Sequence, residues 1–294
     1  MNEDAPMDIT RIGDFSLQWG ESLVWDERGQ RLYFVDCLAR TIHWIAHGSC
    51  DLHGMSTPSM PTGLVPTDDE RVIVVLEEGL HVADPDRGDL ASLAAFPEEI
   101  GGRCNDACAD LNGNLITGKL NLGPAEGSAW WYSAVHGWRL LDPDIANTNG
   151  PAVAVLDGVM TLIIGDTSAH YYAYPYDPIG GTVGKRQVFG DMTDLAGHPD
   201  GSTMDRDGGL WCALFDGAQI VRFTTDGLDR TVAVPVRNPT DVAFGGPDLD
   251  CLYVVSTSGD DPLAGALLRI DGLGSVGRAE PRFAAHRARP IPNS

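Results

Sequence analysis

The sequence predicts an all-β protein, a six-bladed β-propeller with four-stranded blades around a central axis. A turn followed by a short apolar run recurs six times along the 294 residues, with a mean spacing of 44 residues. Each copy is followed by a second run of the same kind. Periods of this length with several strands per unit are typical of propeller blades, whereas helical repeats would space their apolar residues three and four apart.

The six copies have the same internal order. Each opens with an aspartate-glycine or similar turn and continues as a short run rich in Val, Ile, Leu, Tyr and Trp, residues that favour strands. The first runs are DERGQRLYFVD (26–36), DDERVIVVL (68–76), DLNGNLITG (110–118), LDGVMTLIIGD (156–166), DRDGGLWCAL (205–214) and GPDLDCLYVVS (246–256). The second runs are TIHWIA (41–46), GLHVADP (79–85), SAWWYS (128–133), HYYAYPYD (170–177), AQIVRFT (218–224) and GALLRID (265–271). We therefore expect each unit to be a β-meander, and ring closure to leave no long open strand edge.

One ring accounts for the whole chain, so we expect residues 1–294 to form a single domain. The ring spans about residues 10–285, and no linker rich in Pro, Gly and Ser divides it. The polar, proline-containing tail, residues 286–294, is expected to be loose.

The charge balance excludes several classes of partner. The chain has 42 Asp and Glu against 20 Lys and Arg, a formal net charge of −22. Nucleic acid and anionic membrane surfaces need clustered cations, which the sequence lacks, so we expect neither as a partner. Aspartate outnumbers glutamate by 32 to 10, beside 35 Gly and 19 Pro, which favours turns between strands over helices.

The chain is expected to be cytoplasmic. Its first ten residues, MNEDAPMDIT, lack the basic start and apolar stretch of a secretory signal, and no apolar run approaches the ~20 residues of a membrane helix. The six cysteines are scattered, which favours reduced thiols, although export with three disulfides remains an alternative. Cys104 and Cys108 lie four apart but lack the further regularly spaced partners of a zinc site.

Polar residues stand at the entry to five of the repeats, 10 to 13 residues before the leucine that each of these repeats has in its first run. They are Glu21, Asn105, Asn149, Asp200 and Asp241, with Arg103 and Asp106 beside Asn105. Equivalent positions in different blades converge on the axis, where carboxylates at close range repel one another unless a cation lies among them. An all-oxygen set favours a hard divalent ion, Ca²⁺ first, with Mn²⁺, Mg²⁺, Fe²⁺ and Zn²⁺ as alternatives. Each residue taken alone could instead be a strand-entry cap.

These segments resemble a known family. GESLVWDERGQRLYFVD, GRCNDACADLNGNLITGKL, TNGP, HPDGSTMDRDGGLWCALFDG and PTDVAFGGPDLDCLYVVSTS are similar, in this order and across nearly the whole chain, to the signature segments of the senescence-marker-protein/gluconolactonase/regucalcin family. The resemblance implies a six-bladed propeller that hydrolyses sugar lactones with a divalent metal on its axis. It makes Glu21, Asn149 and Asp200 the metal ligands, Arg103 and Asn105 the substrate contacts, and Asp200 also the general base.

The sequence departs from the family pattern at several places. Lys119 replaces a small residue, Gly123 stands where some members have an acidic sugar contact, and Leu23 replaces a proline. These departures keep two alternatives open: a phosphotriester or ester hydrolase that uses the same site, and a metal-binding propeller without turnover. His198, two residues before Asp200, could line the pocket. The expected partner is a small lactone, and the expected assembly is a monomer or small homo-oligomer.

Overall fold

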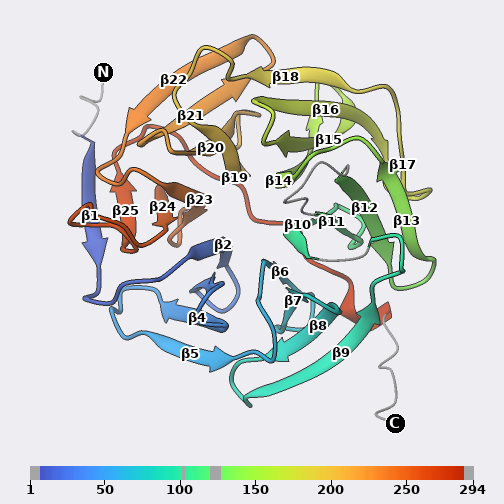
Figure 1. Cartoon of the computed structure of the whole chain (residues 1–294), viewed down its shortest axis with the longest axis horizontal. Helices are drawn as coiled ribbons and strands as arrows, with labels where there is room; N and C mark the ends of the chain where they lie inside the picture. Colours follow the sequence, from blue (N-terminus) through green and yellow to red (C-terminus); the bar gives the residue numbers. More distant parts are fainter. Residues whose placement is uncertain (1–6, 101–102, 120–126, 288–294) are drawn as a thin grey trace.

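The structure is a computed structural model that describes residues 7–100, 103–119 and 127–287. Six antiparallel sheets form a ring around a central axis, which confirms the predicted propeller (Figure 1). The innermost strand of each blade is, in ring order, β2 (Gly20–Asp26), β6 (Gly63–Pro66), β10 (Cys104–Ala109), β14 (Thr148–Leu156), β19 (His198–Met204) and β23 (Pro239–Gly245).

The outer strands follow each inner strand as a meander. In blades 1 to 3 they are β3 (Arg31–Asp36), β4 (Thr41–Ala46) and β5 (His53–Ser56); β7 (Val72–Leu76), β8 (Gly79–Asp84) and β9 (Asp89–Ala95); β11 (Leu115–Lys119), β12 (Ser128–Ser133) and β13 (Gly137–Asp142). In blades 4 to 6 they are β15 (Val159–Asp166), β16 (His170–Asp177), β17 (Thr182–Val183) and β18 (Gln187–Asp191); β20 (Leu210–Phe215), β21 (Gln219–Thr224) and β22 (Gly227–Ala233); β24 (Cys251–Ser256) and β25 (Leu267–Asp271).

Two blades differ from a simple four-strand meander. In blade 4 the outermost position is shared, because β17 and β18 both pair with β16. In blade 6 the outermost strand comes from the other end of the chain: β1 (Asp8–Ile12) pairs antiparallel with β25. The N-terminal strand therefore closes the ring.

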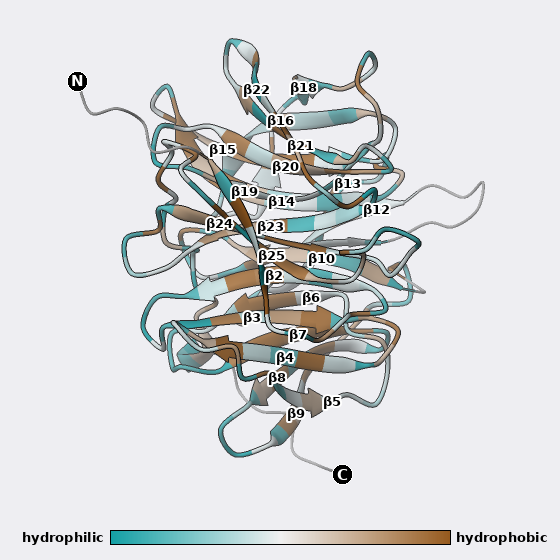
Figure 2. Ribbon diagram, turned by 90° about the vertical axis from the view of Figure 1, so that its left-hand side faces the viewer, coloured by the Kyte–Doolittle hydropathy of each residue, from teal (hydrophilic) through white to brown (hydrophobic). Residues whose placement is uncertain are grey.

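The apolar core lies between neighbouring blades. Large side chains that are almost fully buried include Trp25, Trp131 and Trp211, and Trp130 and Tyr253 are also buried. Removing such a side chain from water contributes about 1.5–3 kcal/mol. The hydrophobic segments lie along the strands, while the connecting loops are largely hydrophilic (Figure 2).

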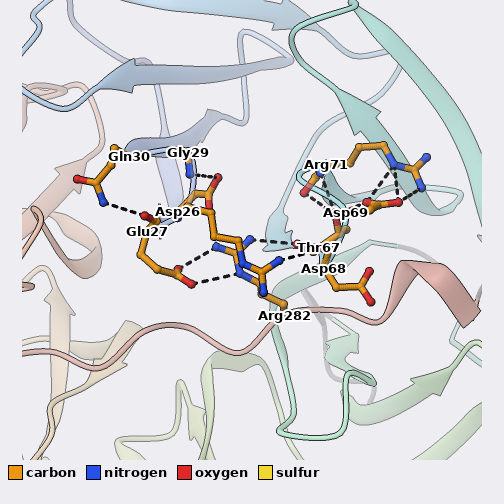
Figure 3. A network of polar contacts seen from close by, with 10 residues as sticks. Asp26, Glu27, Gly29, Gln30, Thr67, Asp68, Asp69, Arg71 and Arg282 are labelled. Carbon is orange, nitrogen blue, oxygen red and sulfur yellow. Dashed lines mark hydrogen bonds and ion pairs between the residues drawn. The ribbon is translucent and has the colours of Figure 1, made fainter.

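After β25 the chain crosses the axis at one end of the ring. Gly277 bridges to Asp205 of blade 5, and Phe283 bridges to Thr67 of blade 2 on the other side. Arg282 holds this crossing segment by ion pairs with Asp26 and Glu27 and by a hydrogen bond to the Thr67 carbonyl oxygen at 3.0 Å (Figure 3).

Four of the six cysteines, Cys37, Cys104, Cys212 and Cys251, are buried in the apolar core. The one helix among the described residues is the 3₁₀ turn Ala285–Arg287, so no described helix is long and apolar enough to cross a bilayer. The predicted loose tail falls mostly on residues 288–294, which lie outside the described residues. All six cysteines are free thiols, and only Cys50 is exposed.

Candidate functional site

Beta-bulges turn the axial side chains toward one another. In five blades the pairing of the two innermost strands shifts register at the predicted polar residue, whereas the pair β6·β7, which has no such residue, runs without a shift. The shifts fall between Glu21 and Val24, Asn105 and Ala107, Asn149 and Ala152, Pro199 and Ser202, and Pro239 and Asp241. A bulge bends its strand and re-aims a side chain, so the bulges place these polar groups on the axis.

Two of the bulges have a residue with left-handed backbone, and the one that is not glycine is strained. Ser22, directly after Glu21, has a φ of 55°, and Gly150, directly after Asn149, has a φ of 43°. A non-glycine residue in the left-handed region costs about 1–3 kcal/mol. The Ser22 hydroxyl accepts a hydrogen bond from the Leu64 amide at 2.6 Å, and this bond to the neighbouring blade helps to hold the strained turn.

A pocket of about 360 Å³ opens at the end of the ring where the inner strands begin. The crossing C-terminal segment lies at the other end, because it contacts the residues that follow the ends of β6 and β19. The pocket is lined by Trp19, Glu21, Arg103, Asn105, Asn147, Asn149, Thr167, His198, Pro199, Asp200 and Phe215.

Four buried carboxylates share the axis, and burial raises the pKa of each. Burial and the neighbouring Asp106 raise the pKa of Glu21 to about 8, and burial raises the pKa of Asp106 to about 6. The pKa values of Asp200 and Asp241 lie well above their usual range, because burial is reinforced by the charges of Glu21 and Asp106. All four side chains are at most 8% exposed. The protein therefore builds an acidic centre that favours a bound cation or proton.

Amides complete the inner layer. Asn105 Nδ2 donates to Asn149 Oδ1 and, at 3.1 Å, to the Thr148 carbonyl oxygen. Asn149 Nδ2 donates to the Pro199 carbonyl oxygen at 2.8 Å. These bonds point the Asn149 oxygen toward the pocket side of the axis, and an amide oxygen has a second lone pair for another partner.

The oxygen atoms available as metal ligands in the pocket fit a hard divalent ion. Trp19 Nε1 donates to Glu21 Oε1 at 3.0 Å, which leaves Glu21 Oε2 buried without a hydrogen bond. Among the residues that the structure describes, no three His, Cys, Asp or Glu side chains converge on one point as a metal cluster. An ion at this site would thus need the Asn149 amide oxygen together with the Glu21 and Asp200 carboxylates, and such all-oxygen sets suit Ca²⁺ or Mg²⁺.

The structure brings most of the predicted residues together. Glu21, Arg103, Asn105, Asn149 and Asp200 all line the one pocket, and so does His198.

Asp106 and Asp241, by contrast, face a separate cavity of about 40 Å³ beneath the pocket, whose floor includes Glu280 of the crossing segment. Leu23 lines that lower cavity. Lys119 ends β11 and is not among the pocket-lining residues, and Gly123 lies outside the described residues.

The sequence did not predict five of the pocket residues: Trp19, Asn147, Thr167, Pro199 and Phe215. Trp19 and Asn147 each stand two residues before a predicted ligand, so strand alternation was a usable signal for them. Thr167 and Phe215 come from the ends of second strands, which the repeat pattern does not connect with the axis.

Fold and site together define a six-bladed propeller with a buried acidic ligand pocket on its axis. The chain belongs to the SMP-30/gluconolactonase/LRE-like family, whose model matches residues 19–258. It is similar to pentonolactonase XacC of Haloferax volcanii, with 30% identity over 93% of this chain and 97% of that protein. It is also similar to the L-arabinolactonase of Azospirillum brasilense, with 30% identity over 94% and 95%.

A solved structure supports the same assignment. Regucalcin from Agrobacterium tumefaciens, described as a calcium-binding protein, has a TM-score of 0.85 to this chain at 26% identity, and the match covers 93% of this chain and 96% of that one. The family resemblance that the sequence motifs indicate is thus confirmed.

Proposed function

We propose that the protein hydrolyses a sugar-derived or similar small lactone to its hydroxy acid with the help of one divalent metal ion. The observation that carries this proposal is the meeting of Glu21, Arg103, Asn105, Asn149 and Asp200, from four different blades, in one pocket. The names of its relatives, a pentonolactonase and an L-arabinolactonase, support lactones as the substrate class.

The metal would be held by Glu21 Oε2, the Asn149 amide oxygen and the Asp200 carboxylate. A divalent ion bound there polarises the lactone carbonyl and stabilises the charge that develops on its oxygen. Calcium is the favoured ion because every ligand is a hard oxygen donor.

Arg103 and Asn105 orient the substrate. The guanidinium of Arg103 has a buried Nε without a hydrogen bond, so it can donate to the lactone or its hydroxyls. Its charge also offsets that of the carboxylates, because it lowers the pKa of Glu21 and of Asp106 against the larger effect of burial.

Asp200 is the proposed general base. Burial and neighbouring carboxylates raise the pKa of Asp200, so this carboxylate is a stronger base than an exposed aspartate. As water attacks the carbonyl carbon, Asp200 takes its proton. The ring C–O bond then breaks, and the proton passes to the leaving ring oxygen to give the hydroxyl of the product.

The test is a panel of lactones followed by the fall in pH as acid forms. We expect turnover that chelation abolishes and that Ca²⁺, Mn²⁺, Mg²⁺ or Zn²⁺ restores to different extents. Asp200→Asn should lose at least about a hundredfold in kcat, the usual contribution of a general base. The matched control is Asp248→Asn, because Asp248 is exposed on a turn of blade 6.

Full activity after exhaustive chelation, or in Asp200→Asn, would contradict this mechanism. A parallel panel of phosphotriesters and simple esters tests the alternative hydrolase. Metal binding without turnover on either panel would indicate a non-catalytic propeller.

A further inference from the structure

The pocket holds more unsatisfied polar groups than the proposed metal and substrate contacts use. Among the described residues, ten buried side-chain nitrogen or oxygen atoms have no hydrogen-bond partner. Four of the ten belong to residues that line this one pocket: Glu21 Oε2, Arg103 Nε, Asn147 Oδ1 and Thr167 Oγ1. The first two have proposed partners in the metal and the lactone, whereas Asn147 and Thr167 have none.

Asn147 and Thr167 form a pair at the pocket end of blade 4. The ladder between β14 and β15 pairs Thr148 with Asp166, so its continuation by one residue sets Asn147 opposite Thr167. Directly opposed residues of an antiparallel pair have their side chains on the same face. That face is also the face of Asn149, because residues two apart on a strand point the same way.

The side chains of Asn147 and Thr167 do not hydrogen-bond to each other through these two oxygen atoms. Neither the Asn147 Oδ1 atom nor the Thr167 Oγ1 atom has any hydrogen-bond partner within the protein, although both are buried. An unsatisfied buried polar atom destabilises the fold, so such atoms are rare unless a ligand pairs with them. A ligand that enters the pocket with hydroxyl groups would supply both a donor for the amide oxygen and an acceptor for the threonine hydroxyl.

Another wall of the pocket is apolar. Trp19 of blade 1 stacks on Phe215 of blade 5, with ring centroids 6.3 Å apart and an interplanar angle of 17°. Trp19 belongs to blade 1, across the axis from blade 4 in a ring of six, whereas Phe215 belongs to blade 5, next to blade 4, so the aromatic pair reaches from the far side of the axis to the side of the polar pair. The pocket therefore has a polar wall and an aromatic wall.

We propose that Asn147 and Thr167 are a hydroxyl-binding subsite that selects polyhydroxylated lactones over lactones without free hydroxyls. The substrate places a hydroxylated edge against this pair and a C–H face against Trp19 and Phe215. This inference rests on the proposed function, since it concerns the specificity of the same pocket.

The first test is Thr167→Val, which removes the hydroxyl and keeps the shape. Two substrates are compared, a five-carbon sugar lactone and γ-butyrolactone, which carries no free hydroxyl. We expect the ratio of their kcat/KM values to fall about tenfold, through KM for the sugar lactone, as the loss of one hydrogen bond predicts. Asn147→Ala should lower the same ratio. In Thr161→Val, a change on the same strand but away from the pocket, the ratio should stay the same.

Protein stability separates specificity from a structural role. Because the Thr167 hydroxyl has no partner within the protein, Thr167→Val should leave the Tm of the free protein unchanged or raise it. A lower Tm with an unchanged ratio would assign the hydroxyl to the fold and overturn the inference.

The remaining outcomes are distinct. A wild-type protein that opens the sugar lactone, but whose substrate ratio does not change in Thr167→Val and Asn147→Ala, overturns the subsite and leaves the proposed function standing. A wild-type protein that opens no lactone overturns the proposed function.

In that second case a binding measurement still tests the subsite. A five-carbon aldonic acid should raise the Tm of the wild type more than that of Thr167→Val, and γ-hydroxybutyrate should not distinguish them. If each acid raises the Tm of Thr167→Val as much as it raises that of the wild type, the subsite is overturned.

Discussion

Replacing Asp106 with asparagine should stabilise the metal-free protein at neutral pH. Asp106 is 5% exposed, its Oδ2 accepts from the Gly150 amide at 2.7 Å, and its Oδ1 has no partner. Asparagine keeps an oxygen for the Gly150 amide and replaces the unsatisfied oxygen with an NH₂ group. That group can donate to the carboxylates of Glu21, Asp200 or Asp241.

The magnitude follows from the pKa of Asp106. Burial raises it from 3.8 to about 6, so above pH 6 the charged form destabilises the folded state relative to the unfolded state. The difference corresponds to about 3 kcal/mol at pH 7.5, since each pH unit is worth 1.36 kcal/mol. A raised carboxyl pKa makes the protein more stable as pH falls from 6 toward 4. The advantage of asparagine should therefore shrink to about half of this at pH 5 and to less than about 1 kcal/mol at pH 4.

The assay is thermal or urea unfolding in EDTA at several pH values, with Asp248→Asn as the exposed control. For a chain of this length about 3 kcal/mol corresponds to a rise of roughly 6 °C in Tm at pH 7.5. Added Ca²⁺ should reduce the difference, because a cation already offsets the repulsion. A stabilisation that does not change between pH 7.5 and pH 4, or a loss of stability at pH 7.5, would refute the reasoning.

Three further changes test other parts of the structure. Gly201→Ala should destabilise the protein by about 1–3 kcal/mol in urea unfolding, because the new Cβ would lie 2.0 Å from Asp241 Oδ1; wild-type stability would contradict the packing. Trp19→Phe keeps an aromatic ring but removes the donor to Glu21, so calorimetry should show at least a tenfold weaker affinity for Ca²⁺, and unchanged affinity would mean that the hydrogen bond does not orient this carboxylate. Arg282→Met leaves two buried or half-buried carboxylates of blade 1 unpaired and should cost about 3–5 kcal/mol; a cost below about 1 kcal/mol would show that the crossing segment is held by other contacts.

The fold was predictable because its signals are local. Each of the six repeats has an apolar residue at the same place in its first run, and these residues lie on the second strand of their blades and are at most 2% exposed: Leu32, Val72, Leu115, Leu162, Leu210 and Leu252. Turn chemistry and apolar runs identify such strands without any knowledge of the rest of the chain. The exposed outer strands gave no comparable signal: β5 and β13, for example, contain no fully buried residue.

The sequence predicts which residues form most of the candidate site, but not how they are arranged in space. Spacing from the repeat placed Glu21, Asn149 and Asp200 at equivalent strand positions, and they line one pocket. The bulges beside them depend on two strands at once, and no single strand encodes such a shift in its own sequence. The same holds for the crossing segment, whose contacts join residues more than 200 positions apart in the chain.

The closing pair of strands has a consequence for synthesis of the chain. Because β1 pairs with β25, β1 leaves the ribosome long before the strand with which it pairs. Five blades can form from neighbouring segments as they emerge, but the β1·β25 pair of blade 6 cannot. A chain that stops before Leu267 would expose a free strand edge at blade 6 and an unpaired β1, and such edges recruit other chains into aggregates. For this protein the synthesis of β25 decides whether the product is a closed ring or an aggregation-prone fragment.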